Sequence, residues 1–256
     1  MIQRVEAKVR QRRRRRQMAA GTIAALVVGA VLLVPWLRDT ATISTQAGAS
    51  RELELADGSR VRLNARTTLR TDFRYGRRHL RLLNGQAYFV VVRDASRPFA
   101  VETPNGTVRV IGTEFDVRLG ADQRPEVTLL RGAIRFEAKG GVIALQPGQQ
   151  IWTGRKDDGF EVRALSPEEL ASHTAWHEGK LVLDGLSLAE VAERLSAFHG
   201  SQIEVAPEVA RLRPGGTVPL ANLPSVLEVL RETLGVRVVP QGNGSYRLSG
   251  QESAGG

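Results

Sequence analysis

The chain has 256 residues, of which 42% are hydrophobic and 25% charged, and it contains no cysteine. This length accommodates two small domains, and the lack of cysteine excludes disulfides, thiolate metal sites and a cysteine nucleophile. The formal net charge of +9 is concentrated in residues 1–16, which hold eight basic residues and one acid, whereas the rest of the chain carries 28 basic and 26 acidic groups. A nucleic-acid-binding face would need those charges inside a folded domain, so the charge does not indicate direct nucleic-acid binding.

One uncharged run of 20 residues covers 18–37. As a helix it would span about 30 Å, the thickness of a bilayer core, so we predict a single transmembrane helix over 18–37. Five arginines precede it, and the positive-inside rule places residues 1–17 in the cytoplasm as a basic tail. Two alternatives stay open: a cleaved signal peptide, and an arginine run that binds anionic lipid or nucleic acid.

Short segments of alternating hydrophobic residues, separated by Gly-containing turns, fill the region 44–163. Alternation and frequent turns are typical of β-strands. The pattern predicts strands at 51–55, 60–64, 67–72, 79–83, 86–92, 98–102, 107–111, 114–119, 126–130, 132–137, 142–145 and 149–153. We therefore expect a mainly β domain over 44–163, either a sandwich or a β-solenoid-like stack.

Four ordered blocks within this region form a recognisable set. They contain Asp57, Gly58, Ser59 and Asn64; Gly85 and Phe89; Arg97, Pro98 and Phe99; and Gly112, Thr113 and Phe115. Together these blocks resemble the FecR domain. From the residue types, their expected roles are structural: Asp57-Gly58 turns the chain, Asn64 caps a turn, Pro98 fits a strand at a sheet edge, and Gly112 marks a bulge.

The spacing of hydrophobic residues changes after Ser166-Pro167-Glu168-Glu169, a segment that has the pattern of a helix start. Hydrophobic residues at helical spacing predict helices over 188–198 and 223–234, each ended by a glycine, with short strands between them. The expected order over 172–249 is βαββαββ, a small α+β domain. It resembles the STN domain shared by secretins and TonB-dependent receptors. The resemblance rests on residues that include Trp176, Leu181, Leu188, Val191 and Ile203, and these five are also our candidate partner-binding residues.

Side chains with catalytic or metal-binding chemistry are scarce. His173 and His177 have the i, i+4 spacing of a zinc pair, but no glutamate lies between them and no third ligand is evident. We expect solvent-facing histidines and no metal, and we interpret the arginines at 74, 77, 78 and 81 as a solvated strand edge. No nucleophile, base and oxyanion set can be assembled, so we predict neither enzymatic activity nor a cofactor.

The resemblance to FecR proteins implies a single-pass inner-membrane sensor with periplasmic C-terminal domains. Such proteins relay the state of a TonB-dependent outer-membrane receptor, in iron-uptake signalling, to a cytoplasmic ECF sigma factor. We expect the usual sigma-binding domain of these proteins to be missing or truncated in this chain, because the only large apolar residues within 2–17 are Ile2, Val5 and Val9. The alternative is a non-signalling envelope scaffold that uses the same two domains for docking.

Overall fold

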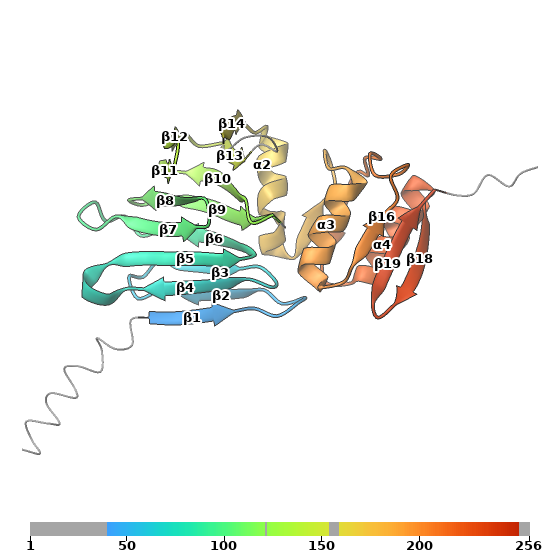
Figure 1. Cartoon of the computed structure of the whole chain (residues 1–256), viewed down its shortest axis with the longest axis horizontal. Coiled ribbons are helices and arrows are strands. Elements are labelled where there is room, and N and C mark those ends of the chain that lie inside the picture. Colours follow the sequence, from blue (N-terminus) through green and yellow to red (C-terminus); the bar gives the residue numbers. More distant parts are fainter. Residues whose placement is uncertain (1–39, 121, 154–158, 251–256) are drawn as a thin grey trace, which may run out of the picture.

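The computed structural model describes residues 40–120, 122–153 and 159–250. They form two lobes, a first lobe of strands over 40–164 and a second lobe of helices and strands over 167–249, which lie side by side along the long axis of the molecule (Figure 1). The predicted tail 1–17 and the predicted transmembrane segment 18–37 lie outside the described residues. Among the residues that are described, no helix has the length and apolar character needed to cross a membrane.

The first lobe consists of two seven-stranded sheets. One sheet has the order β1-β4-β5-β7-β8-β11-β12, and the other has the order β14-β13-β10-β9-β6-β3-β2. The strands are β1 (Thr40–Ser44), β2 (Arg51–Glu54), β3 (Arg60–Leu63), β4 (Thr68–Asp72), β5 (Arg78–Asn84), β6 (Gln86–Val90), β7 (Phe99–Thr103), β8 (Gly106–Val110), β9 (Glu114–Leu119), β10 (Pro125–Arg131), β11 (Ile134–Ala138), β12 (Gly141–Leu145), β13 (Gln149–Thr153) and β14 (Phe160–Ala164), with a short 3₁₀ turn η1 (Arg74–Gly76) between β4 and β5.

The two sheets enclose one hydrophobic core. It contains the fully buried rings of Phe89, Phe99, Phe115 and Phe136 together with aliphatic residues from both sheets. This arrangement is a sandwich, although strand order within each sheet follows the chain, as in a solenoid. The prediction of a mainly β region is confirmed, and all twelve predicted strands exist within two residues of their expected bounds. The sequence did not predict β1 and β14, which are exposed edge strands with few buried side chains.

The second lobe contains α2 (Pro167–Thr174), η2 (Ala175–Glu178), β15 (Lys180–Val182), α3 (Leu188–His199), β16 (Ile203–Val205), β17 (Thr217–Pro219), α4 (Leu223–Leu234), β18 (Arg237–Gly242) and β19 (Ser245–Ser249). From β15 onward the order is the expected βαββαββ. The helices begin where the sequence indicates, because Ser166 and Ser187 form capping boxes with Glu169 and Glu190. The strands form a pair, β15-β17, and a three-stranded sheet, β16-β19-β18.

The two ends of the sandwich differ in what surrounds them. At one end, here called the near end, β1 begins, and the turns 55–59, 73–77, 91–98 and 111–113 gather around it. At the opposite end the second lobe packs, and Ala65 from the β3-β4 turn joins the core of that lobe. The first lobe therefore separates the start of the described chain from the second lobe (Figure 1).

Candidate functional site

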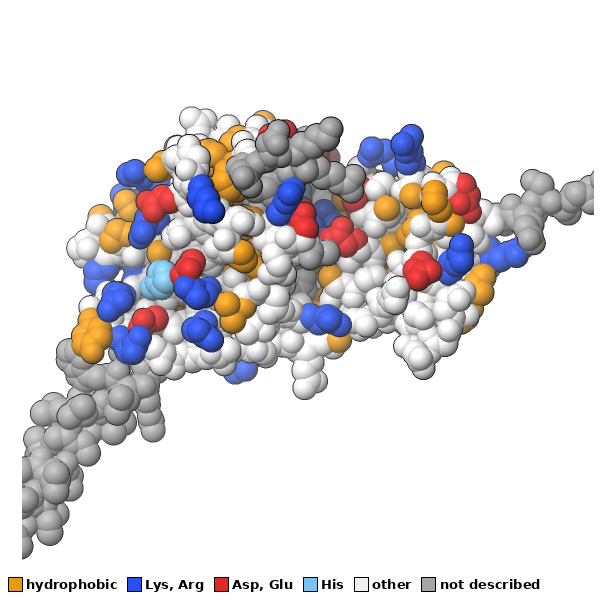
Figure 2. All heavy atoms as spheres, viewed as in Figure 1, with side chains coloured by type: hydrophobic (Ala, Val, Ile, Leu, Met, Phe, Trp, Pro, Cys, Tyr) orange, Lys and Arg blue, Asp and Glu red, His pale blue; other side chains and the backbone are white. Residues whose placement is uncertain are grey.

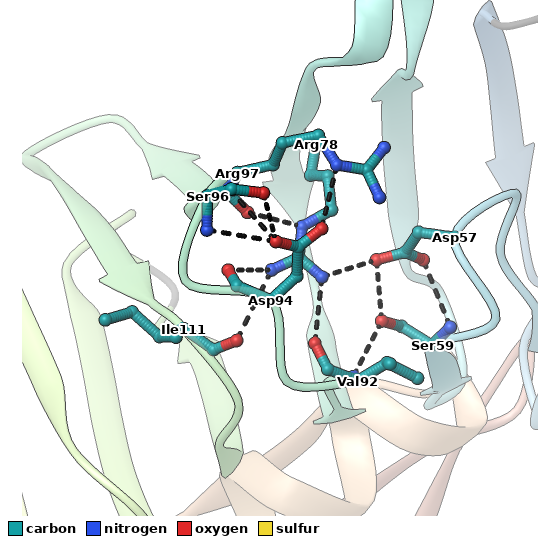
Figure 3. Close-up of polar contacts among 8 residues, drawn as sticks. All are labelled: Asp57, Ser59, Arg78, Val92, Asp94, Ser96, Arg97 and Ile111. Carbon is teal, nitrogen blue, oxygen red and sulfur yellow. Dashed lines mark hydrogen bonds and ion pairs between the residues drawn. The ribbon is translucent and has the colours of Figure 1, made fainter.

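The FecR-like blocks converge on one buried arginine at the near end of the sandwich. Arg78 begins β5, and its side chain is 1% exposed. The guanidinium pairs with Asp57 at 3.1 Å, and it donates hydrogen bonds to the carbonyl oxygens of Arg97 at 2.8 Å and Val92 at 2.9 Å (Figure 3). We call Asp57, Ser59, Arg78 and the backbone of 92–97 and 111 the motif hub.

Asp57 and Ser59 form the other half of the motif hub. The Asp57 carboxylate accepts hydrogen bonds from the backbone and hydroxyl of Ser59, and the Ser59 hydroxyl in turn accepts from the backbone N–H of Val92 (Figure 3). The Arg78 Nη2 lies within 3.5 Å of the carbonyl oxygens of Asp94 and Ile111. A buried charge is tolerable only when its partners are in place, so the hub holds three turns together by one ion pair.

The expectation of a solvated strand edge is therefore wrong for Arg78. Its neighbours Arg74, Arg77 and Arg81 are exposed, as expected. Arg78 differs because β5 is a central strand, hydrogen-bonded to β4 and β7, and residue 78 points inward against Phe99. The sequence signal was present in Asp57, since a buried guanidinium needs a carboxylate partner.

The other motif residues are mostly structural. Asn64 caps its turn through a hydrogen bond from Ala65 N, and Thr113 donates to Ala133 O. Gly85 has a φ of +86° and lies where a Cβ would come within 2.3 Å of Thr67.

Two details of the motif differ from expectation. Pro98 precedes the central strand β7 rather than an edge strand. Gly112 allows the backbone of Arg93 to approach, since a Cβ would lie 2.6 Å from the Arg93 Cα, and the bulge lies in β10 instead.

A second polar cluster joins the lobes, and we call it the junction. The Trp176 indole N–H donates to the buried carboxylate of Asp116 at 3.2 Å, and Gln86 Nε2 donates to the same carboxylate at 2.8 Å. Arg62 donates to the backbone oxygen of His177, whose ring contacts that of Tyr88 at a tilt of 46° with 3.8 Å between centroids. Burial raises the pKa of Tyr88, and its hydrogen bond to Glu114 adds to the effect.

Both histidines predicted to face solvent lie in the junction, so that prediction is wrong. The side chain of His177 is 13% exposed and lies against Tyr88 and Trp176, with its Nε2 3.8 Å from the Asp116 carboxylate. Burial, with a contribution from Arg194, lowers the pKa of His173 to about 4, so this ring is neutral near pH 7. The physical reason is that His173 of α2 and His177 of η2 face the first lobe, where they lie against Gln150 and Tyr88.

The junction surrounds a cavity of about 500 Å³ that is lined from both lobes. Arg118 bridges its wall by pairing with Glu193 of α3 at 2.7 Å and with Glu126 at 3.3 Å. Although burial opposes charge, these two carboxylates raise the pKa of Arg118. Burial, and then the proximity of Arg118, lowers the pKa of Arg194. The cavity is thus lined by charges of both signs.

The five candidate partner-binding residues all lie in the core of the second lobe. Trp176, Leu181, Leu188, Val191 and Ile203 are buried there. They shape the lobe, so any partner would contact other residues on its surface. Within the described parts of the chain, no group of three or more His, Cys, Asp or Glu residues could hold a metal ion.

Comparison with known proteins agrees with this geometry. Residues 41–135 match the family model described as FecR protein. The first lobe thus contains a FecR domain. The match extends from β1 into β11 and includes every residue of the motif hub.

Solved structures extend the likeness to the second lobe. Two crystal structures of a protein from Parabacteroides distasonis ATCC 8503, described as a "putative anti-sigma factor", have TM-scores of 0.72 and 0.71 at 24% sequence identity. Each alignment covers 83% of this chain and 100% of the other, so the shared fold includes lobes on both sides of the junction. No curated protein matches the chain.

Proposed function

We propose that this chain is a transmembrane regulator that carries a periplasmic signal inward, of the anti-sigma type. In this proposal residues 18–37 anchor it in the inner membrane, and both lobes lie in the periplasm. The observation that carries the proposal is the FecR domain at 41–135, supported by a fold shared across both lobes with a protein described as an anti-sigma factor.

The path of β1 supports a relay between the second lobe and the membrane segment. β1 starts at the near end, three residues after the apolar run 18–37, and pairs with β4 along its whole length. The loop that follows β1 reaches the second lobe, where Gly48 N donates to the carbonyl oxygen of Phe198 at 2.8 Å. A displacement of α3 would therefore act directly on the strand nearest the membrane anchor.

The second lobe is the proposed receiver for a TonB-dependent outer-membrane receptor. Among the described strands, β18 pairs with β19 alone, and we propose that the other edge of this six-residue strand takes an added strand. Main-chain hydrogen bonds along such an edge would supply affinity without specific side chains. This fits the second lobe, because its five candidate partner-binding residues are all buried. In this proposal the output is an ECF sigma factor on the cytoplasmic side.

Deleting residues 172–256 from the full chain tests the proposal. We expect the deletion to abolish the transcriptional response to the receptor, and an unchanged response would contradict it. Limited proteolysis of the FecR domain serves as the control, because that domain must stay folded for the result to be interpreted.

A pull-down from membranes separates the regulator from the docking scaffold. The full chain, and a form extended upstream by any open reading frame, are cross-linked in membranes and the captured proteins identified. Recovery of a sigma factor supports the regulator, whereas recovery of envelope proteins alone with both forms supports the scaffold.

A further inference from the structure

The near end of the FecR domain carries an exposed patch that contains hydrophobic and basic side chains together. Tyr75, Val92 and Ile111 are 71%, 47% and 42% exposed, and they are among the few large hydrophobic side chains exposed in the described residues. They come from three different turns of the near end. Figure 2 shows hydrophobic and basic side chains intermixed at this end of the sandwich.

The turns of this patch touch one another. Asp94 N donates to the carbonyl oxygen of Ile111 at 2.8 Å. A Cβ on Gly58 would lie 3.8 Å from the Val92 side chain, and a Cβ on Gly76 would lie 4.0 Å from that of Arg97. The exposed residues therefore form one surface, which we call the near-end patch.

The charge of the near-end patch is positive. Arg74 and Arg97 are neutralised by ion pairs with Asp72 and Asp94. Arg77 lies over the ring of Tyr75 and, more weakly than Arg74, helps to lower the pKa of Asp72, but among the described residues neither Arg77 nor Arg93 forms an ion pair with a carboxylate. Two exposed guanidinium groups thus remain beside exposed apolar side chains, a combination suited to an anionic lipid surface.

The near-end patch lies close in the chain to the predicted membrane segment, which favours the bilayer surface as its partner. The apolar run ends at residue 37 and β1 begins at Thr40. Three residues span at most about 10 Å, so a membrane-inserted run would hold the near end within about that distance of the headgroups. The second lobe packs at the opposite end, so it does not cover the patch.

The motif hub gives the patch a fixed shape. Arg78 donates to the carbonyl oxygens of Val92 and Arg97 and approaches that of Ile111, so one buried side chain positions the turns 91–98 and 111–113 from within (Figure 3). Ordering these turns in advance lowers the entropy that binding would otherwise cost.

We propose that the near-end patch rests on the headgroups of an anionic bilayer and fixes the orientation of the FecR domain above it. This inference depends on the membrane anchor of the proposed function. Contact of a rigid domain with the bilayer would let a force on the second lobe act as a lever on β1.

The test uses the full chain in vesicles, and the lack of cysteine allows a single label. An environment-sensitive fluorophore is attached to the cysteine of the variant Ile111→Cys. The control is the variant Val142→Cys, labelled in the same way, because Val142 is also exposed but lies away from the near end. Vesicles contain phosphatidylcholine alone or an equimolar mixture with phosphatidylglycerol, each with a headgroup-bound quencher. We expect quenching at position 111, stronger with phosphatidylglycerol, and none at position 142.

Charge variants sharpen the test. Replacing Arg77 and Arg93 together by Gln is expected to remove the gain from phosphatidylglycerol without breaking any ion pair of the described residues. The matched control replaces Arg70 and Arg135, which are exposed on strands β4 and β11, and is expected to change nothing. Equal quenching at 111 and 142, or an equal loss with both double variants, would overturn the inference.

Failure of the anchor gives a different result. A chain that alkaline washing removes from the vesicles contradicts both the anchor and the near-end contact. A chain that stays in the vesicles but shows no quenching at position 111 contradicts the near-end contact alone.

Discussion

The two lobes achieve specificity by different means. The FecR domain buries an ion pair, Arg78 with Asp57, and uses it to connect turns that are far apart in sequence. The core of the second lobe is apolar, with hydrogen-bonded caps at its helix ends, and its polar side-chain contacts with the first lobe lie at the junction. A sequence motif can therefore mark a tertiary polar cluster in one lobe, whereas the sequence pattern of the other lobe marks local helix ends.

The variant Arg78→Met tests this contrast with the largest expected effect on stability. It leaves the Asp57 carboxylate buried without its cation and several carbonyl oxygens without a donor, so we expect a loss of about 3–5 kcal/mol in the free energy of unfolding. Arg81→Met is the control, because its ion pair with Glu102 is exposed and contributes at most about 1 kcal/mol. Denaturant titration measures both, and equal losses would contradict a special role for the hub.

Gly85→Ala tests the turn beside the junction. The added Cβ would meet Thr67 at 2.3 Å in a backbone with φ of +86°, and we expect a loss of about 3 kcal/mol from left-handed strain and overpacking together. Gly148→Ala isolates the strain alone, because its φ is +80° and no atom lies near its Cβ. Thermal unfolding of the two variants gives the comparison, and a Gly148 effect as large as that of Gly85 would contradict the steric account.

Trp176→Phe tests whether the junction holds the second lobe. A smaller aromatic ring replaces the indole and the donor to Asp116 is lost; a hydrogen bond to a charged group contributes about 2 kcal/mol. We expect faster hydrogen exchange in α3 and β16, with β4, β5 and β7 unchanged. The exposed Trp152 provides the control variant Trp152→Phe, and uniform acceleration in both lobes would show that the junction is not a separate unit.

The smallest expected effect is a pH dependence from His173. Its folded pKa of about 4 lies below the ordinary value, so the unfolded chain binds more protons and stability falls as pH drops from about 6.5 to about 4. The full shift would correspond to about 3 kcal/mol, and partial solvent access leaves an effect on the order of 1 kcal/mol. The variant His173→Gln should flatten this slope in denaturant titrations, while replacing the exposed His79 should leave it in place.

Local patterns in the sequence predicted the second lobe well. The capping serines 166 and 187 and the terminal glycines 200 and 235 act within one turn of their helices, so their effect is visible without the fold. The same holds for the alternating strands β2 to β13. Edge strands β1 and β14, which bury few side chains, were not predicted.

Long-range partners could not be predicted in the same way. Arg78 finds its acceptors 14 to 33 residues away, and four arginines within eight residues looked alike. His173 and His177 lie on polar segments whose burial depends on how one lobe packs on the other. The junction therefore became visible only in the folded chain.

Site-specific photo-cross-linking in the cell envelope tests the central claim that the second lobe receives the signal. A photoreactive amino acid replaces Val229 on α4 or Val142 on β12, two exposed valines on different lobes, in the full chain. We predict adducts with an outer-membrane receptor from position 229 and none from position 142. Adducts from position 142 alone, or no receptor adduct from either position, would contradict it.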